Sequence, residues 1–144
     1  RSRHAILPGD GRALRHTRDM DEEVTRTRAA AVLRRAGASF GFVFGSRAPG
    51  GQPRSGSDLD VAAYWTVSPP NAWDVLVPEG VDLLVLNTAP LELAGAIALN
   101  GDLLFEADPA ARVRWVATTR KTWLDEKPRF ERAHREFLEA LRGR

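Results

Sequence analysis

The sequence contains no cysteine, and this absence excludes several classes of protein at once. A chain without thiols has no disulfide framework, no thiolate zinc site and no cysteine nucleophile. No apolar run comes near the roughly 20 residues that a helix needs to span a bilayer. We therefore expect a soluble protein without a membrane segment, located in the reducing cytoplasm.

Familiar catalytic signatures are missing as well. The chain has no GxxxxGK[ST] loop, no HExxH pair and no GxSxG nucleophile elbow. Its three histidines, His4, His16 and His134, are scattered, and we expect His134 to pack beside an apolar helix stripe. The length of 144 residues, with 43% hydrophobic and 28% charged residues, is typical of one globular domain.

The charge is unevenly distributed along the chain. Residues 1–18 hold five Arg against one Asp, residues 19–111 hold six Arg against thirteen carboxylates, and residues 112–144 are basic again. A protein that tracks phosphates is expected to gather Lys and Arg on its working face. An acidic centre with basic ends argues against direct binding of nucleic acid.

Hydrophobic periodicity predicts alternating helices and strands. Residues 1–18 show no sustained period, so we expect a flexible basic tail followed by one domain over residues 19–144. Asp19 and Glu22 have the spacing of a capping box and predict a helix that Gly37 ends. The predicted strands are 39–45, 58–65, 81–87 and 102–106, and the further helices are 72–77 (one or two turns), 90–100, one from Pro109 and another after Pro128. This order describes a mixed α/β domain.

Three aspartates stand in predicted strands. Asp58 and Asp60 project from one strand face, which they share with Ala62, and Asp82 interrupts the buried-strand pattern VDLLVL. Burying unpaired carboxylates that repel one another is costly, and Mg²⁺, which prefers carboxylate oxygens, compensates for it. The pattern therefore predicts a metal site. Strand-end carboxylates in water, or an Asp that caps the glycine-rich loop, would give the same pattern.

A Gly-Ser pair lies at the end of the strand that carries Phe40, Phe42 and Phe44. Glycine lets a phosphate approach the backbone, and the hydroxyl of Ser46 with successive N–H groups donates to anionic oxygens. Most Gly-Ser pairs are merely turns. Gly45 and Ser46 gain meaning from the glycine- and proline-rich loop and the DLD strand that follow them.

The combination resembles the nucleotidyltransferase superfamily typified by DNA polymerase beta. More closely, Gly45-Ser46-Arg47-Ala48, then Ser57-Asp58-Leu59-Asp60-Val61, then Val81-Asp82-Leu83-Leu84-Val85 is similar to the minimal nucleotidyltransferases (MNT). These are small prokaryotic proteins usually encoded beside a HEPN-domain toxin. The resemblance covers roughly residues 22–142. One departure is the segment between Ser46 and Asp58, which has eleven residues, one more than usual in the family.

The resemblance implies a fold and a role for each motif residue. The fold is a mixed, mostly antiparallel sheet of about four strands with flanking helices and a helical C-terminal region. Asp58 and Asp60 would hold two Mg²⁺ ions around ATP, and Asp82 would complete the site for the ion that activates the attacking hydroxyl. Gly45 and Ser46 would hold the β- and γ-phosphates. Arg47, from its place after Ser46, is a candidate for another phosphate contact, and a solvated surface Arg fits it equally well.

The leading hypothesis is an antitoxin that transfers AMP from ATP to a hydroxyl, expected to be that of a Tyr, of its HEPN toxin. A non-catalytic antitoxin that acts by binding the toxin is the first alternative. A small-molecule nucleotidyltransferase is the second, although such enzymes usually carry an extra helical domain. The sequence leaves the oligomeric state open, a homo-oligomer included.

Overall fold

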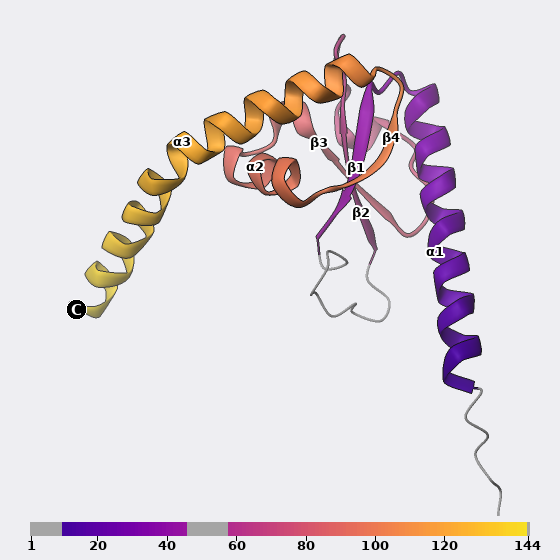
Figure 1. The fold of residues 1–144 in the computed structure, drawn as a ribbon, viewed down its shortest axis with the longest axis horizontal. Coiled ribbons are helices and arrows are strands. Elements are labelled where there is room, and N and C mark those ends of the chain that lie inside the picture. The colour runs from indigo at the N-terminus through magenta and orange to yellow at the C-terminus, as the bar shows by residue number, and fades with distance from the viewer. Residues whose placement is uncertain (1–9, 46–57, 144) are drawn as a thin grey trace, which may run out of the picture.

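The computed structural model describes residues 10–45 and 58–143 of the chain. These residues form three α-helices, two short 3-10 helices and one four-stranded sheet, arranged as an arch (Figure 1). In chain order the elements are α1 (Asp10–Arg35), β1 (Phe40–Phe44), β2 (Leu59–Tyr64), η1 (Ala72–Asp74), β3 (Val81–Val85), η2 (Leu86–Thr88), α2 (Leu91–Asn100), β4 (Asp102–Glu106) and α3 (Pro109–Arg142).

The sheet has the strand order β3-β2-β1-β4. Strand β1 pairs antiparallel with both β2 and β4, whereas β2 and β3 run parallel. The expected mixed, mostly antiparallel sheet of four strands is therefore confirmed. The strand containing Asp82 differs from the prediction: β3 is an edge strand, so its face at Asp82 is exposed rather than buried.

Helices cover the sheet on both faces. On one face, Ala29 and Leu33 of α1 form a core with Val43, Val61 and other strand residues. On the opposite face, Ile97 of α2 and Ala111 of α3 pack against the phenylalanines of β1. Because successive side chains of a strand point to opposite faces of the sheet, the apolar residues of each central strand contribute to both cores.

The three phenylalanines of β1 lie on one face of the sheet. Phe40 and Phe42 point to the α2/α3 side, where their rings lie 5.6 and 5.9 Å from the ring of Trp115. Phe44 packs against the same core. This aromatic layer anchors α3 over the centre of the sheet.

Helix α1 is longer than the capping pattern predicts. It begins at Asp10, so residues 10–18, expected to belong to the flexible tail, are helical, and Asp19 with Glu22 lies inside the helix. The physical reason is local propensity: Arg, Ala and Leu are strong helix formers, and no Pro or Gly interrupts the run from residue 12 onward. Residues 1–9 of the expected tail lie outside the described residues.

Helix α3 is one continuous element of 34 residues, whereas the sequence predicts two helices separated near Pro128. The Asp108 side chain caps its start by accepting a hydrogen bond of 3.1 Å from the Ala111 N–H. Proline removes only one backbone donor and its ring bends a helix without always ending it. Figure 1 shows α3 as a curved helix that extends well beyond the sheet.

Helices α2 and α3 pack closely at one point. A side chain at Gly95 of α2 would overlap the indole of Trp123, so the absence of a Cβ there lets the two helices approach. Arg120 of α3 adds a hydrogen bond of 2.6 Å from its Nε to the carbonyl oxygen of Ala98. This contact fixes the direction in which α3 leaves the sheet.

Within residues 10–45 and 58–143, no helix is long and apolar enough to cross a membrane.

Candidate active site

The candidate site lies at the end of the sheet where β1 ends and β2 begins. In the parallel pairing of β2 with β3, Asp60 stands directly opposite Asp82. Neighbouring strands lie about 4.8 Å apart, and side chains paired in register point to the same face. The two aspartates therefore share the α2/α3 face, on which Ala62 also lies, as the alternation predicts.

Contacts at the two ends of the paired strands fix this register. At one end, the Leu59 N–H donates to the carbonyl oxygen of Gly80 at 2.7 Å. At the other end, the Asn87 amide accepts from the Trp65 N–H at 3.0 Å and donates to the Trp65 carbonyl oxygen at 2.7 Å. Because a slip of one residue would turn Asp82 to the opposite face, these contacts position the acidic pair.

Asn87 and Gly80 are the positioning residues that the sequence analysis missed. The only signal was a polar amide directly after the apolar run VDLLVL, and a glycine directly before it. Gly80 has a φ of +81°, a conformation that glycine adopts at little cost. Such signals acquire meaning only when the partner strand is known.

Gly45 lies against the carboxylate of Asp60. Its φ is +91°, and a Cβ built on it would collide with Oδ2 of Asp60. Phe44, the residue before it, is the antiparallel partner of Asp60. The chain therefore turns away from β1 at a point where only a residue without a side chain leaves room for the carboxylate.

Asp58 stands apart from this pair. It precedes β2 and is exposed, as Asp82 is, while Asp60 is half-buried. In the part of the chain that the structure describes, no three His, Cys, Asp or Glu side chains come together as a metal site. Carboxylates repel one another when no cation lies between them, and exposed ones are free to separate into water. The cost of burying three carboxylates, on which the sequence argument rested, is therefore not incurred.

The donor set nevertheless fits Mg²⁺ in kind. Carboxylate oxygens are the ligands that this ion prefers, and it needs only one or two of them because water and phosphate oxygens complete its shell. Asp60 and Asp82 supply two carboxylates from rigid, adjacent strands. Ser46 and Arg47, the predicted phosphate ligands, lie outside the described residues.

The remaining candidates from the sequence have structural roles or none. Trp65 is buried and its indole N–H donates to the Ala36 carbonyl oxygen at 3.0 Å. Trp123 is buried as well, whereas Trp73 is 80% exposed. His134 is exposed, which corrects the expectation that it packs against the apolar stripe.

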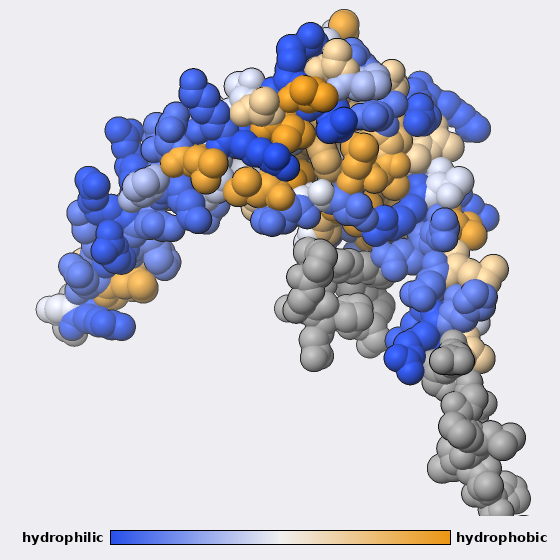
Figure 2. Space-filling model, viewed as in Figure 1, coloured by the Kyte–Doolittle hydropathy of each residue, from blue (hydrophilic) through white to orange (hydrophobic). Residues whose placement is uncertain are grey.

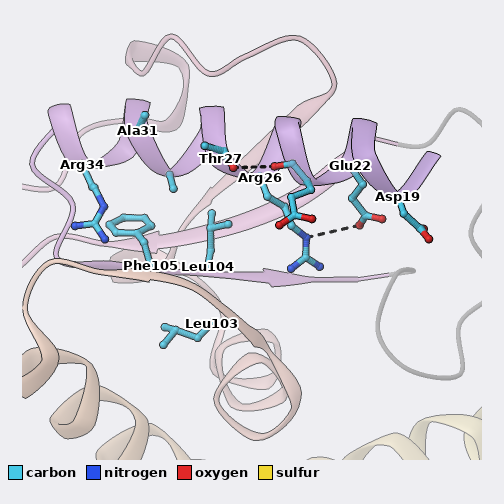
Figure 3. A pocket seen from close by; sticks show the side chains of 11 residues that line it. Asp19, Glu22, Arg26, Thr27, Ala31, Arg34, Leu103, Leu104 and Phe105 are labelled. Atoms are coloured by element: carbon cyan, nitrogen blue, oxygen red, sulfur yellow. Dashed lines mark hydrogen bonds and ion pairs between the residues drawn. The ribbon is translucent and has the colours of Figure 1, made fainter. Parts of the chain in front are cut away.

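A groove of about 670 Å³ lies between α1 and β4, away from the aspartates (Figure 3). Arg26 in this groove pairs with Asp102 at 2.9 Å and with Glu22 at 3.8 Å. The guanidinium of Arg34 lies 5.1 Å from the centre of the Phe105 ring. Arg26 and Arg34 thus join α1 to β4, and the groove contains none of the aspartates of the motif.

Comparison with known proteins gives a consistent picture of the fold. No protein-family model matches the sequence, and no curated protein matches it. Solved structures do match it. A toxin–antitoxin crystal structure with AMP-PNP has a TM-score of 0.55 and 19% identity, and the match covers 76% of this chain and 98% of that chain.

Two further structures of the same kind match. One is a crystal structure of a toxin–antitoxin MntA–HepT mutant in which two aspartates two positions apart are replaced by glutamate (TM-score 0.54, 18% identity, 76% of this chain, 98% of that one). The other is a re-refined complex of the tri-AMPylated Shewanella oneidensis HEPN toxin with an MNT antitoxin (TM-score 0.53, 16% identity, 78% of this chain, 98% of that one).

At these identities the likeness establishes the fold. The chain shares the fold of the minimal nucleotidyltransferase chains in these structures. More specifically, it matches the MntA antitoxin of toxin–antitoxin pairs over nearly the full length of that antitoxin.

Proposed function

We propose that this chain is an antitoxin that transfers AMP from ATP to a hydroxyl group of a HEPN-domain toxin, with Tyr as the expected acceptor. The observation that carries the proposal is the register of Asp60 with Asp82 beside Gly45, on an MNT fold. Among the matching structures, one contains AMP-PNP and another an AMPylated HEPN toxin. These support the choice of ATP as donor and of a toxin as acceptor.

In the proposed reaction, the acceptor oxygen attacks the α-phosphorus of ATP. A new oxygen–phosphorus bond forms, the bond to the β-phosphate oxygen breaks, pyrophosphate leaves and the hydroxyl proton passes to solvent or a carboxylate. We assign Asp58, Asp60 and Asp82 as catalytic residues and as ligands for two Mg²⁺ ions. We assign Gly45, Ser46 and Arg47 to the phosphates. When bound, Mg²⁺ supplies charge neutralisation for the attacking and leaving oxygens.

The contribution of the protein is mainly positioning. Asp60 and Asp82 lie on strands whose register is fixed at both ends, so their backbones stand opposite one another before substrate arrives. Gly45 leaves the space beside Asp60 open. Preorganised charges of this kind lower the barrier because they need no rearrangement during the reaction.

The test is incubation with labelled ATP, Mg²⁺ and the protein encoded beside this chain's gene, followed by mass spectrometry of that protein. A mass increase of one or more AMP units on a Tyr is expected. Absence of any adduct, with the partner bound, would support the alternative in which the antitoxin neutralises by binding alone. Adducts on added small molecules but not on the neighbouring protein would support a small-molecule nucleotidyltransferase.

A further inference from the structure

The C-terminal half of α3 carries an apolar stripe that nothing in the described chain covers. Every residue from Lys127 to Arg142 is exposed, among them Phe130, Phe137 and Leu141, which are 42%, 60% and 54% exposed. At 3.6 residues per turn, these three side chains and Trp123 fall within about 40° of one another around the helix axis. We call Phe130, Phe137 and Leu141 the α3 stripe.

The α3 stripe continues a surface that already binds a helix. Trp123, on the same face, packs against Gly95 of α2, and its ring lies 5.4 Å from that of Phe130. Ten residues of α2 span about 15 Å, whereas the 34 residues of α3 span about 51 Å. The packing face of α3 is therefore much longer than the helix that occupies it.

Charge indicates what kind of partner fits the stripe. Residues 124–142 contain five basic and five acidic side chains, so this arm has no net charge. A nucleic acid or an anionic membrane is attracted by clustered positive charge, which the arm lacks. An amphipathic helix of another protein fits this arm better. Its apolar face would pack on the stripe as α2 packs on the preceding turns of α3, and its polar side chains would lie beside the charge-balanced residues that flank the stripe.

The position of the arm relates it to the site. Figure 1 shows that the C-terminal half of α3 extends to the side of the molecule on which β1 ends and β2 begins. Figure 2 shows apolar surface near the C-terminal end of α3, on the side turned toward the rest of the chain. A protein held on the stripe would therefore approach the side of the molecule that carries Asp60 and Asp82.

We propose that the α3 stripe is the docking surface for a helix of the protein that receives AMP. This inference rests on the proposed function and adds the surface that brings the acceptor to the site. Docking by α3 separates recognition from chemistry: the stripe supplies affinity, and the sheet edge supplies the reactive groups.

The test compares two variants of the full chain by calorimetry with the protein encoded beside its gene. The double variant Phe137→Gln, Leu141→Gln removes the two most exposed residues of the stripe and keeps good helix formers. The control is Leu124→Gln, because Leu124 is as exposed as Leu141, at 54%, but points about 100° away around the helix. We expect a Kd raised about a hundredfold by the double variant, the effect of losing two apolar anchors, and raised less than about twofold by the control.

Binding of ATP, measured in the same variants, is expected to stay unchanged, and circular dichroism is expected to show an intact fold. An unchanged Kd in the double variant overturns the docking proposal. So does a dimer of this chain alone that the double variant dissolves in analytical ultracentrifugation, because the stripe would then bind a second copy.

The failure of the docking proposal and that of the proposed function give different results. If AMP is transferred and the double variant binds the partner as tightly as the unchanged chain, the docking proposal is wrong and the proposed function stands. Stripe-dependent binding of the same partner without AMP transfer contradicts the proposed catalysis, and it supports the stripe as the surface through which the chain holds its partner.

Discussion

The carboxylate of Asp60 lies in the space that a side chain at residue 45 would occupy. Gly45 combines this contact with a φ of +91°, so two independent reasons exclude a larger residue there. The consequence concerns the site rather than the core. A Cβ at residue 45 meets the end of a side chain, which rotates away, and that side chain is the central carboxylate of the proposed site.

We predict that Gly45→Ala and Gly80→Ala lose similar stability but differ in nucleotide binding. Gly80 has nearly the same backbone conformation, with a φ of +81°, and no atom within 4 Å of an added Cβ. Each variant should lose about 1 kcal/mol in urea unfolding because alanine is strained at positive φ. Only Gly45→Ala should weaken binding of ATP with Mg²⁺, by about tenfold or more, because it displaces Asp60. Equal binding by both variants would remove the positional role of Gly45.

A second prediction concerns the α2–α3 crossing. Glycine-to-alanine replacement inside an exposed helix stabilises it by up to about 1 kcal/mol, but at Gly95 the new methyl group meets the indole of Trp123. We expect Gly95→Ala to destabilise the protein by about 1–3 kcal/mol, the usual cost of overpacking. In a Trp123→Ala background, which keeps only the Cβ of the three contacting atoms, the same change should cost clearly less. A double-mutant cycle by urea unfolding measures the difference, and equal costs in both backgrounds would contradict the contact.

Local pattern was sufficient to predict the central strands but not the helix ends. The alternation around Phe40–Phe44 and around Asp60 and Ala62 depends on neighbouring residues only, and it gave the correct faces. The start of α1 and the continuity of α3 depend on weak preferences: a capping pattern inside a helix is not distinguishable in sequence from one at its start. Pro128 is similar, because whether a proline bends or ends a helix depends on the whole helix.

The identities of the acidic residues could be predicted, but their surroundings could not. Whether Asp82 is buried depends on strand order, and β3 has a neighbour on one side only. The pairing of Asp60 with Asp82 depends on Asn87 and Gly80, which contact residues far from them in sequence. Non-local contacts of this kind leave almost no trace in a single sequence.

The third prediction tests the acidic residues as ligands. The double variant Asp58→Asn, Asp60→Asn should lose Mg²⁺-dependent binding of ATP in calorimetry, because it removes two charges while nearly preserving side-chain size. Asp74→Asn is the matched control, since Asp74 is an exposed aspartate in η1, outside the proposed site. Undiminished binding in the double variant would exclude these two aspartates as metal ligands.

The last prediction separates catalysis from binding, and Asp82 is the residue that allows it. Asp82 is exposed on an edge strand, so Asp82→Asn should leave folding unchanged, and ATP and the partner protein should still bind. Transfer of AMP should fall about 10²-fold or more, the typical effect of removing one preorganised electrostatic group. The measurement is paired: the rate of AMP transfer to the partner protein, and the growth of cells that express both proteins. If transfer and growth are lost together while the complex persists, neutralisation depends on chemistry. If transfer is lost and growth is fully preserved, binding alone neutralises the partner, and docking on α3 rather than the carboxylates of the sheet edge is then the basis of the antitoxin activity.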